Sequence, residues 1–168
     1  MENKKLNNVA FIDGQNLHLG TTNENWKIDF RKFRIYLKDK FKVNEVYLFL
    51  GFLDEDQDKM YRNLQKSGYI LEFREHNSNM KGKKKGNVDV DIVFEIMRRL
   101  KDEKDFDNIV LVTGDGDYIK LVKYLIENQI LEKILFPNNK YSSLYKSFKD
   151  KYGMNLSQDR VKDLIKYE

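Results

Sequence analysis

The sequence predicts an α/β fold of the doubly wound, Rossmann-like type, with helices on both faces of a mainly parallel sheet. Short runs of β-branched and aromatic residues alternate with longer amphipathic segments almost to the end of the chain. These short runs are apolar throughout, as expected of strands that are covered on both faces. We therefore expect a three-layer domain whose five strands have the order 3-2-1-4-5.

The elements follow one another as strand and helix. The first strand ends at Asp13, the second runs into Gly51, the third precedes a long polar insertion, the fourth ends in a glycine-rich turn and the fifth precedes the single proline, Pro137. Strands are expected near residues 9–13, 45–52, 70–74, 108–113 and 131–136. Helices are expected near residues 15–20, 30–40, 55–67, 88–103, 117–128 and 142–152.

No Ser/Gly-rich linker or internal repeat divides the 168 residues. We expect a single domain over residues 1–168, with a core at about 7–150 and a helical tail at about 151–168. No apolar run reaches the roughly 20 residues of a membrane helix, and the first residues lack the apolar core of a signal peptide. The expected location is the cytoplasm, without membrane association.

The residue types limit the chemistry. The chain contains no cysteine, which excludes disulfides, thiolate zinc sites and cysteine nucleophiles. The only histidines are His18 and His76, so a metal site must rely mainly on carboxylates. Oxygen-rich sites suit Mg²⁺ or Mn²⁺ better than zinc.

Acidic residues stand at the ends of two predicted central strands. Asp13 closes the run Val9-Ala10-Phe11-Ile12, and Asp115 and Asp117 follow the fourth strand in the turn Thr113-Gly114-Asp115-Gly116-Asp117. Capping of the next helix explains one such acid but not two in the same turn. In the expected strand order the first and fourth strands are neighbours, so these acids should meet at one edge of the sheet.

A further acid comes from the helix near residues 88–103. Ile92, Val93 and Ile96 lie three, four and seven residues after Asp89, so Asp89 heads the buried stripe of this helix. Asp91 shares its face with polar residues and is assigned mainly to the surface. Several carboxylates gathered in one place repel each other and lose hydration, which predicts a bound metal ion.

Basic residues lie close to these acids in the sequence. Lys81, Lys83, Lys84 and Lys85 precede the helix that carries Asp89, and the chain has a net charge of +4 with a pI near 9.0. This pattern is consistent with contacts to a polyanionic backbone, although a solvated loop explains it equally well. Arg98, Arg99 and Lys101 are expected to form surface ion pairs. Tyr118, beside the acidic turn, is a candidate for stacking on a nucleic-acid base.

Three segments together resemble the NYN domain family, a branch of the PIN-like nuclease fold. They occur in the family's order and are Phe11-Ile12-Asp13-Gly14-Gln15-Asn16, Lys85-Gly86-Asn87-Val88-Asp89-Val90-Asp91 and Val112-Thr113-Gly114-Asp115-Gly116-Asp117-Tyr118. Two details depart from the commonest form of these motifs, because Thr113 stands where serine is frequent and Asn87 is inserted before Val88.

The resemblance implies a metal-dependent ribonuclease, expected to be an endoribonuclease, that binds Mg²⁺ or Mn²⁺. Asp13, Asp89, Asp115 and Asp117 would be the catalytic metal-site acids, the same four that position and periodicity select, and Asn16 an accessory polar ligand. The expected partner is RNA, single-stranded or structured, and homodimerisation is left open. A non-catalytic RNA-binding module and a small-molecule phosphohydrolase are the alternative functions.

Overall fold

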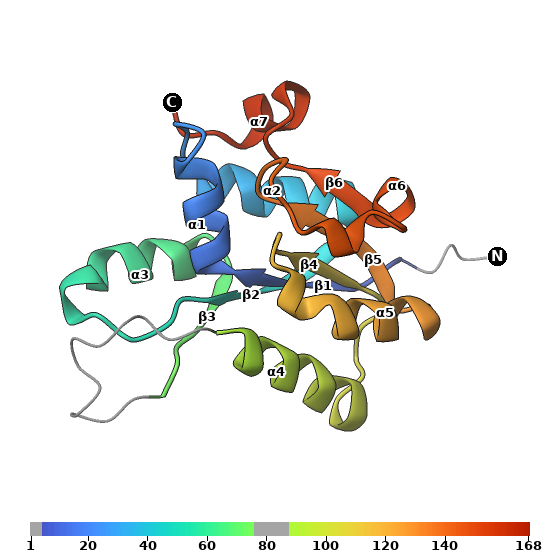
Figure 1. Cartoon of the computed structure of the whole chain (residues 1–168). Helices are drawn as coiled ribbons and strands as arrows, with labels where there is room; N and C mark the ends of the chain where they lie inside the picture. The colour runs from blue at the N-terminus through green and yellow to red at the C-terminus, as the bar shows by residue number, and fades with distance from the viewer. Residues whose placement is uncertain (1–4, 76–87) are drawn as a thin grey trace.

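The computed structural model describes residues 5–75 and 88–168, which form a six-stranded sheet between two layers of helices (Figure 1). All neighbouring strands are parallel, in the order β3-β2-β1-β4-β5-β6. The strands are β1 (Asn8–Asp13), β2 (Val43–Phe49), β3 (Tyr69–Glu72), β4 (Ile109–Val112), β5 (Leu131–Phe136) and β6 (Gly153–Asn155). The predicted α/β class and the order of the first five strands are confirmed, and β6 extends the sheet beyond β5.

The helices alternate with the strands along the chain. They are α1 (Gly14–Thr22), α2 (Phe30–Phe41), α3 (Asp58–Lys66), α4 (Asp89–Asp102), α5 (Ile119–Glu127), α6 (Lys149–Tyr152) and α7 (Asp159–Ile165). Short 3₁₀ turns are formed by Glu55–Gln57, Gly116–Tyr118 and Ser143–Tyr145. No helix among the described residues is long and apolar enough to span a membrane.

The sheet has a separate apolar core on each face because side chains of successive strand residues point to opposite sides. Phe11 and Leu111 face the layer that contains α4 and α5, whereas Ile12 and Val112 face the layer that contains α1, α2, α3 and α7. Every residue of β1 and β4 is buried. This explains why these two strands read as unbroken apolar runs that end at the first polar side chain.

The segment near residues 142–152 differs from its prediction as one helix. It contains the 3₁₀ turn Ser143–Tyr145 and the single-turn helix α6, which ends where β6 begins. Tyr145 is completely buried in this turn, while its neighbour Leu144 is 55% exposed. Inserting the Tyr145 ring into the core bends the chain, so the helical periodicity of this segment does not produce a continuous helix.

The C-terminal residues pack against the core. Leu156 and Ile165 are fully buried beside α2, and the indole Nε1 of Trp26 donates a hydrogen bond to Ser157 Oγ at 3.1 Å. The backbone N–H of Asp29 donates to the carbonyl of Ile165 at 2.9 Å. The last strand and helix therefore complete the layer that covers this face of the sheet.

Arg99 corrects the expectation of surface ion pairs at the end of α4. It is only 3% exposed, and its guanidinium carbon lies 4.8 Å from the ring centre of Tyr47 and 5.4 Å from that of Phe106. Its Nη2 pairs with Glu45 at 3.2 Å and Asp105 at 3.0 Å. Within the described part of the chain, Nε and Nη1 have no hydrogen-bond partner, so the aromatic rings supply their principal contacts.

We predict that Leu156→Ala lowers the free energy of unfolding by about 2–4 kcal/mol, because it removes a fully buried side chain and leaves a cavity. Urea denaturation followed by circular dichroism measures the change. Leu164→Ala is the matched control, since Leu164 is 59% exposed on the adjacent helix and its truncation should change stability by less than about 0.5 kcal/mol. Equal effects of the two substitutions would contradict the packed position of the C-terminal segment.

Candidate metal centre

Acidic side chains from three elements lie at the carboxyl edge of the sheet. Asp13 is the last residue of β1, and β4, its parallel neighbour, leads into the turn that carries Asp115 and Asp117. Asp89 is the first residue of α4, which packs against both β1 and the 3₁₀ turn Gly116–Tyr118. The pairing of Ile12 with Val112 in the β1–β4 ladder places the two strand ends side by side.

Three of these carboxylates converge closely enough to share one ion. Asp89, Asp115 and Asp117 each offer one oxygen, and these oxygens lie within 4.8 Å of one another. Asp89 is buried, Asp115 partly buried and Asp117 exposed, so the group opens toward solvent on the Asp117 side. The side chain of Asp115 also accepts a hydrogen bond from the backbone N–H of Asp117 at 2.9 Å, which fixes the turn.

Asp13 lies beside this group and is joined to it through Tyr118. The Tyr118 hydroxyl is 2.8 Å from Asp89 Oδ1 and 3.1 Å from Asp13 Oδ2. The other Asp13 oxygen, Oδ1, caps α1 by accepting the N–H of Asn16 at 3.0 Å. A phenol has a single proton to donate, so both contacts are satisfied together when one of the two carboxyls carries a proton.

The protonation of Asp13 is consistent with this geometry. Burial raises its pKa from 3.8 to about 6, the hydrogen bonds from Asn16 and Tyr118 oppose that rise, and the charges of Asp89 and Asp115 add to it. The pKa of the Tyr118 hydroxyl is raised far above its ordinary value, first by burial and then by the charges of Asp13 and Asp89. Tyr118 therefore acts as a neutral hydrogen-bond donor at every physiological pH.

Further contacts hold the two turns together. Asn16 Oδ1 accepts the backbone N–H of Gly114 at 2.8 Å and so ties the β1 turn to the β4 turn. The Tyr145 hydroxyl donates to the backbone carbonyl of Asp115. Gly14 allows a close approach of the chains, because a Cβ there would lie 2.5 Å from the carbonyl oxygen of Phe49. Sequence reasoning missed these contacts, since no pattern of residue types signals them.

The structure places the predicted residues in different situations. Asp89 is 7% exposed and Asp91 is partly exposed, in keeping with the periodicity of α4.

The stacking role predicted for Tyr118 is wrong, because its side chain is completely buried and no face of its ring is open to a base. Asn16 uses its amide oxygen to join the two turns, because this oxygen accepts the backbone N–H of Gly114. The predicted nucleic-acid contacts Lys81, Lys83, Lys84 and Lys85 lie outside the described residues.

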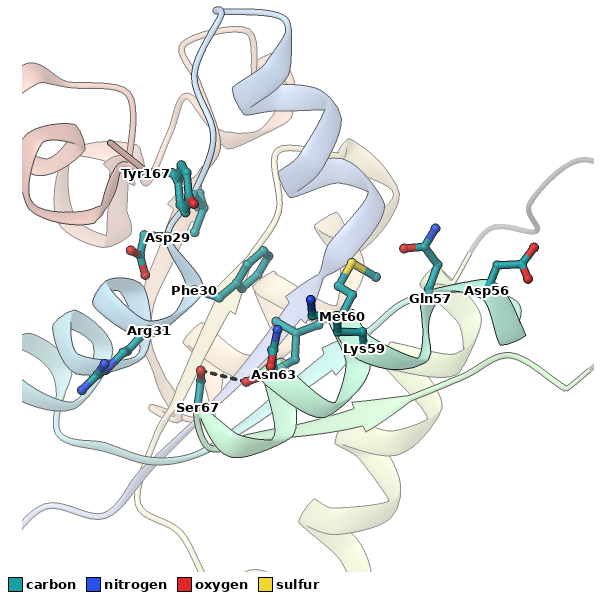
Figure 2. A pocket seen from close by; sticks show the side chains of 12 residues that line it. Asp29, Phe30, Arg31, Asp56, Gln57, Lys59, Met60, Asn63, Ser67 and Tyr167 are labelled. Carbon is teal, nitrogen blue, oxygen red and sulfur yellow. Dashed lines mark hydrogen bonds between the residues drawn. The ribbon is translucent and has the colours of Figure 1, made fainter.

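A groove between α2 and α3 is separate from the acidic cluster. Its volume is about 570 Å³, and its lining includes Phe30, Met60 and Tyr167 together with Arg31 and Lys59 (Figure 2). None of the acids at the carboxyl ends of β1 and β4 contributes to it. Its lining includes two acids, Asp29 and Asp56, and neither belongs to the group of described carboxylates that could hold a metal ion.

A parallel α/β sheet with clustered aspartates at the carboxyl edge of its central strands is in keeping with the PIN-like nuclease fold, to which the matching family model assigns the chain. The model of the NYN domain family matches residues 8–152, and the chain therefore belongs to the NYN domain family.

Two known proteins are similar to this chain. The low amplitude and bright protein LabA of Synechococcus elongatus is 25% identical over 130 residues, which cover 72% of this chain and 68% of LabA. The crystal structure of VPA0982, a protein of unknown function from Vibrio parahaemolyticus, has a TM-score of 0.75 and 19% identity over 99% of both chains. The latter similarity shows that the two proteins share a fold.

We predict that Asp13→Asn stabilises the metal-free protein above pH 6. The raised pKa of Asp13 means that its contribution to stability is fully present below pH 4 and is lost as the pH rises through about 6, when the buried carboxyl ionises. An amide at this position remains neutral and can donate to the Tyr118 oxygen. The expected gain at pH 8 is about 1–3 kcal/mol.

Urea denaturation in EDTA at pH 4.5 and pH 8 measures this gain, which should be about a third as large at the lower pH. Asp39→Asn serves as the control, because Asp39 is exposed on α2 on the other face of the sheet. A variant at Asp13 that is less stable than the wild type at pH 8 would show that the Asp13 carboxylate is not a source of electrostatic strain.

Proposed function

We propose that this protein is a metal-dependent ribonuclease that hydrolyses RNA phosphodiester bonds at the carboxyl edge of its sheet. The observation that carries the proposal is the convergence of Asp89, Asp115 and Asp117 within 4.8 Å. A protein that only binds phosphate gains nothing from three carboxylates beside its ligand, since these repel the phosphate oxygens. Membership in the NYN domain family supports a nuclease function.

The donor set fits Mg²⁺ or Mn²⁺. Carboxylate oxygens are hard ligands, and the described cluster contains neither histidine nor cysteine. Mg²⁺ retains several waters and needs few protein ligands, which agrees with a group that is buried on the Asp89 side and exposed on the Asp117 side. When bound, such an ion neutralises phosphate oxygens and lowers the pKa of a water molecule.

The side chains of the site would then have distinct tasks. Asp89, Asp115 and Asp117 would hold the ion, and the exposed Asp117 would border the path by which RNA approaches. Asp13 would add negative charge behind the ion and keep Asp89 in place through Tyr118. Asn16 would hold the β1 and β4 turns at a fixed separation and present its amide nitrogen to a phosphate or water.

RNA would contact the protein outside the cluster through basic residues. Four lysines precede α4 in the sequence, and we propose that they contact the phosphates of the RNA. They are Lys81, Lys83, Lys84 and Lys85. Such contacts depend on salt and are largely blind to sequence. The shape of the RNA near the acids would therefore determine which phosphodiester bond is cleaved.

We predict that Asp115→Asn and Asp117→Asn lower RNA cleavage at least about a hundredfold and weaken Mn²⁺ binding, because each removes a negative oxygen from the cluster. Cleavage of labelled single-stranded and structured RNA is measured with Mg²⁺, Mn²⁺ or EDTA, and Mn²⁺ binding is measured independently by calorimetry. Asp102→Asn is the control, as this residue is exposed at the far end of α4.

Two outcomes would decide against this proposal. Undiminished cleavage by the Asp115 or Asp117 variant would place the active site elsewhere. RNA binding that is unaffected by EDTA, without cleavage under any condition, would favour a non-catalytic RNA-binding module.

We predict that Tyr118→Phe weakens Mn²⁺ binding about tenfold near pH 6.5 and less at pH 8.5. The hydroxyl lowers the pKa of Asp13, so its removal leaves that carboxyl protonated to a higher pH. At pH 8.5 Asp13 is ionised in both proteins, and only the loss of positioning remains. Tyr124→Phe, at a 42% exposed position on α5, should not change binding at either pH. A loss of affinity that is equal at both pH values would exclude an effect through Asp13.

A further inference from the structure

The outer face of α4 carries an apolar stripe. Val90, Phe94 and Met97 are 76%, 65% and 38% exposed, and they are spaced four and three residues apart on the side opposite the buried Ile92 and Ile96. A helix on the surface of a sheet normally turns polar residues to this side. The exposed positions of α3 follow that rule, because apart from Met60 they are charged or amide side chains.

We propose that this stripe, formed by Val90, Phe94 and Met97, binds the same stripe of a second copy of the chain, with the two α4 helices antiparallel. Phe94 and Met97 lie near the middle of the helix, so a twofold axis between them places each Phe94 on the Met97 of the second copy. An interface of this kind is self-complementary by symmetry. The aromatic and methionine side chains at its centre belong to the residue types enriched in protein interfaces.

The charges along α4 select the antiparallel arrangement. Asp91 lies beside the stripe near the start of the helix, and the exposed Lys101 continues the stripe near its end. About the same twofold axis, Asp91 of each copy comes opposite Lys101 of the other, within about one residue of helical rise. Parallel helices would instead bring the two Lys101 side chains together and the two Asp91 side chains together, which is unfavourable.

Other occupants fit this face less well. A nucleic acid would meet Lys101 and Arg98, but Arg98 is paired with Glu95 at 2.7 Å and with Glu103 at 3.2 Å, and Asp91 adds a further negative charge, so this face does not attract phosphates. The same acids oppose binding to an anionic membrane surface. The stripe from Val90 to Met97 extends over about 10 Å of helix, so it buries less surface than the about 800 Å² per partner of a standard interface. The dimer is therefore weak, with a dissociation constant in the micromolar range or above.

Analytical ultracentrifugation of the full chain, at about 5 to 500 µM, tests the inference. The wild type should shift from monomer to dimer over this range, and Phe94→Glu should raise the dissociation constant at least about tenfold. Ile35→Glu is the matched control, because Ile35 is 53% exposed on α2 and lies on the other face of the sheet. Circular dichroism verifies that each variant is folded.

A charge exchange tests the orientation of the helices. Asp91→Lys and Lys101→Asp should each weaken the dimer, whereas the two substitutions combined should restore it, because each new lysine again faces a new aspartate. A wild type that remains monomeric, or equal effects of Phe94→Glu and Ile35→Glu, would overturn the proposed interface. Failure of the double variant to recover would overturn the antiparallel pairing. The readout is mass, so it is independent of the proposed nuclease activity.

Discussion

The register between β1 and β4, in which Ile12 lies beside Val112, decides where the other residues of the candidate site must lie. Both strands are buried along their whole length, and a shift of the pairing would carry polar groups into the core. The polar residues therefore begin where the strands end. From that edge Asp13 caps α1, Asn16 reaches the backbone of Gly114, and the turn after β4 presents Asp115 and Asp117.

This placement has an electrostatic cost. Asp13 and Asp89 are both buried, and a single neutral phenol, Tyr118, lies between them. The phenol can moderate the repulsion of two ionised carboxyls but cannot neutralise it. A site of this kind is less stable than an apolar core of the same shape, and a divalent cation is the ligand that would best offset the difference. Function and stability are therefore in opposition at this edge of the sheet.

The sequence allows a large part of the fold and site to be predicted because the relevant signals are local or periodic. The apolar runs that end at Asp13 and before Asp115 mark buried strands, and the spacing of Ile92 and Ile96 from Asp89 marks the inner face of α4. The predicted strand order also places β1 beside β4, so acids that are about a hundred residues apart in the chain are expected close together.

Other features depend on contacts that no local pattern encodes. The position of Tyr118 beside the acidic turn makes it a candidate for stacking on a base, but the turn directs its ring into the core. The burial of Arg99 depends on Tyr47 and Phe106, which belong to distant segments. Strand β6 consists of the three residues Gly-Met-Asn, none of which is β-branched or aromatic, so its own composition carries little β signal.

The position of Arg99 gives α4 a mechanical character. Its guanidinium is held between two aromatic rings at one end of the helix, and Asp89 begins the other end, about 15 Å away. Between these two ends, Ile92 and Ile96 are fully buried in the core, so α4 is held along its whole inner face. The pairing of Arg99 with Glu45 and Asp105 therefore fixes, at the amino edge of the sheet, the same helix that carries Asp89 at the carboxyl edge. A carboxylate at the start of so firmly packed a helix has its position set before any ligand arrives.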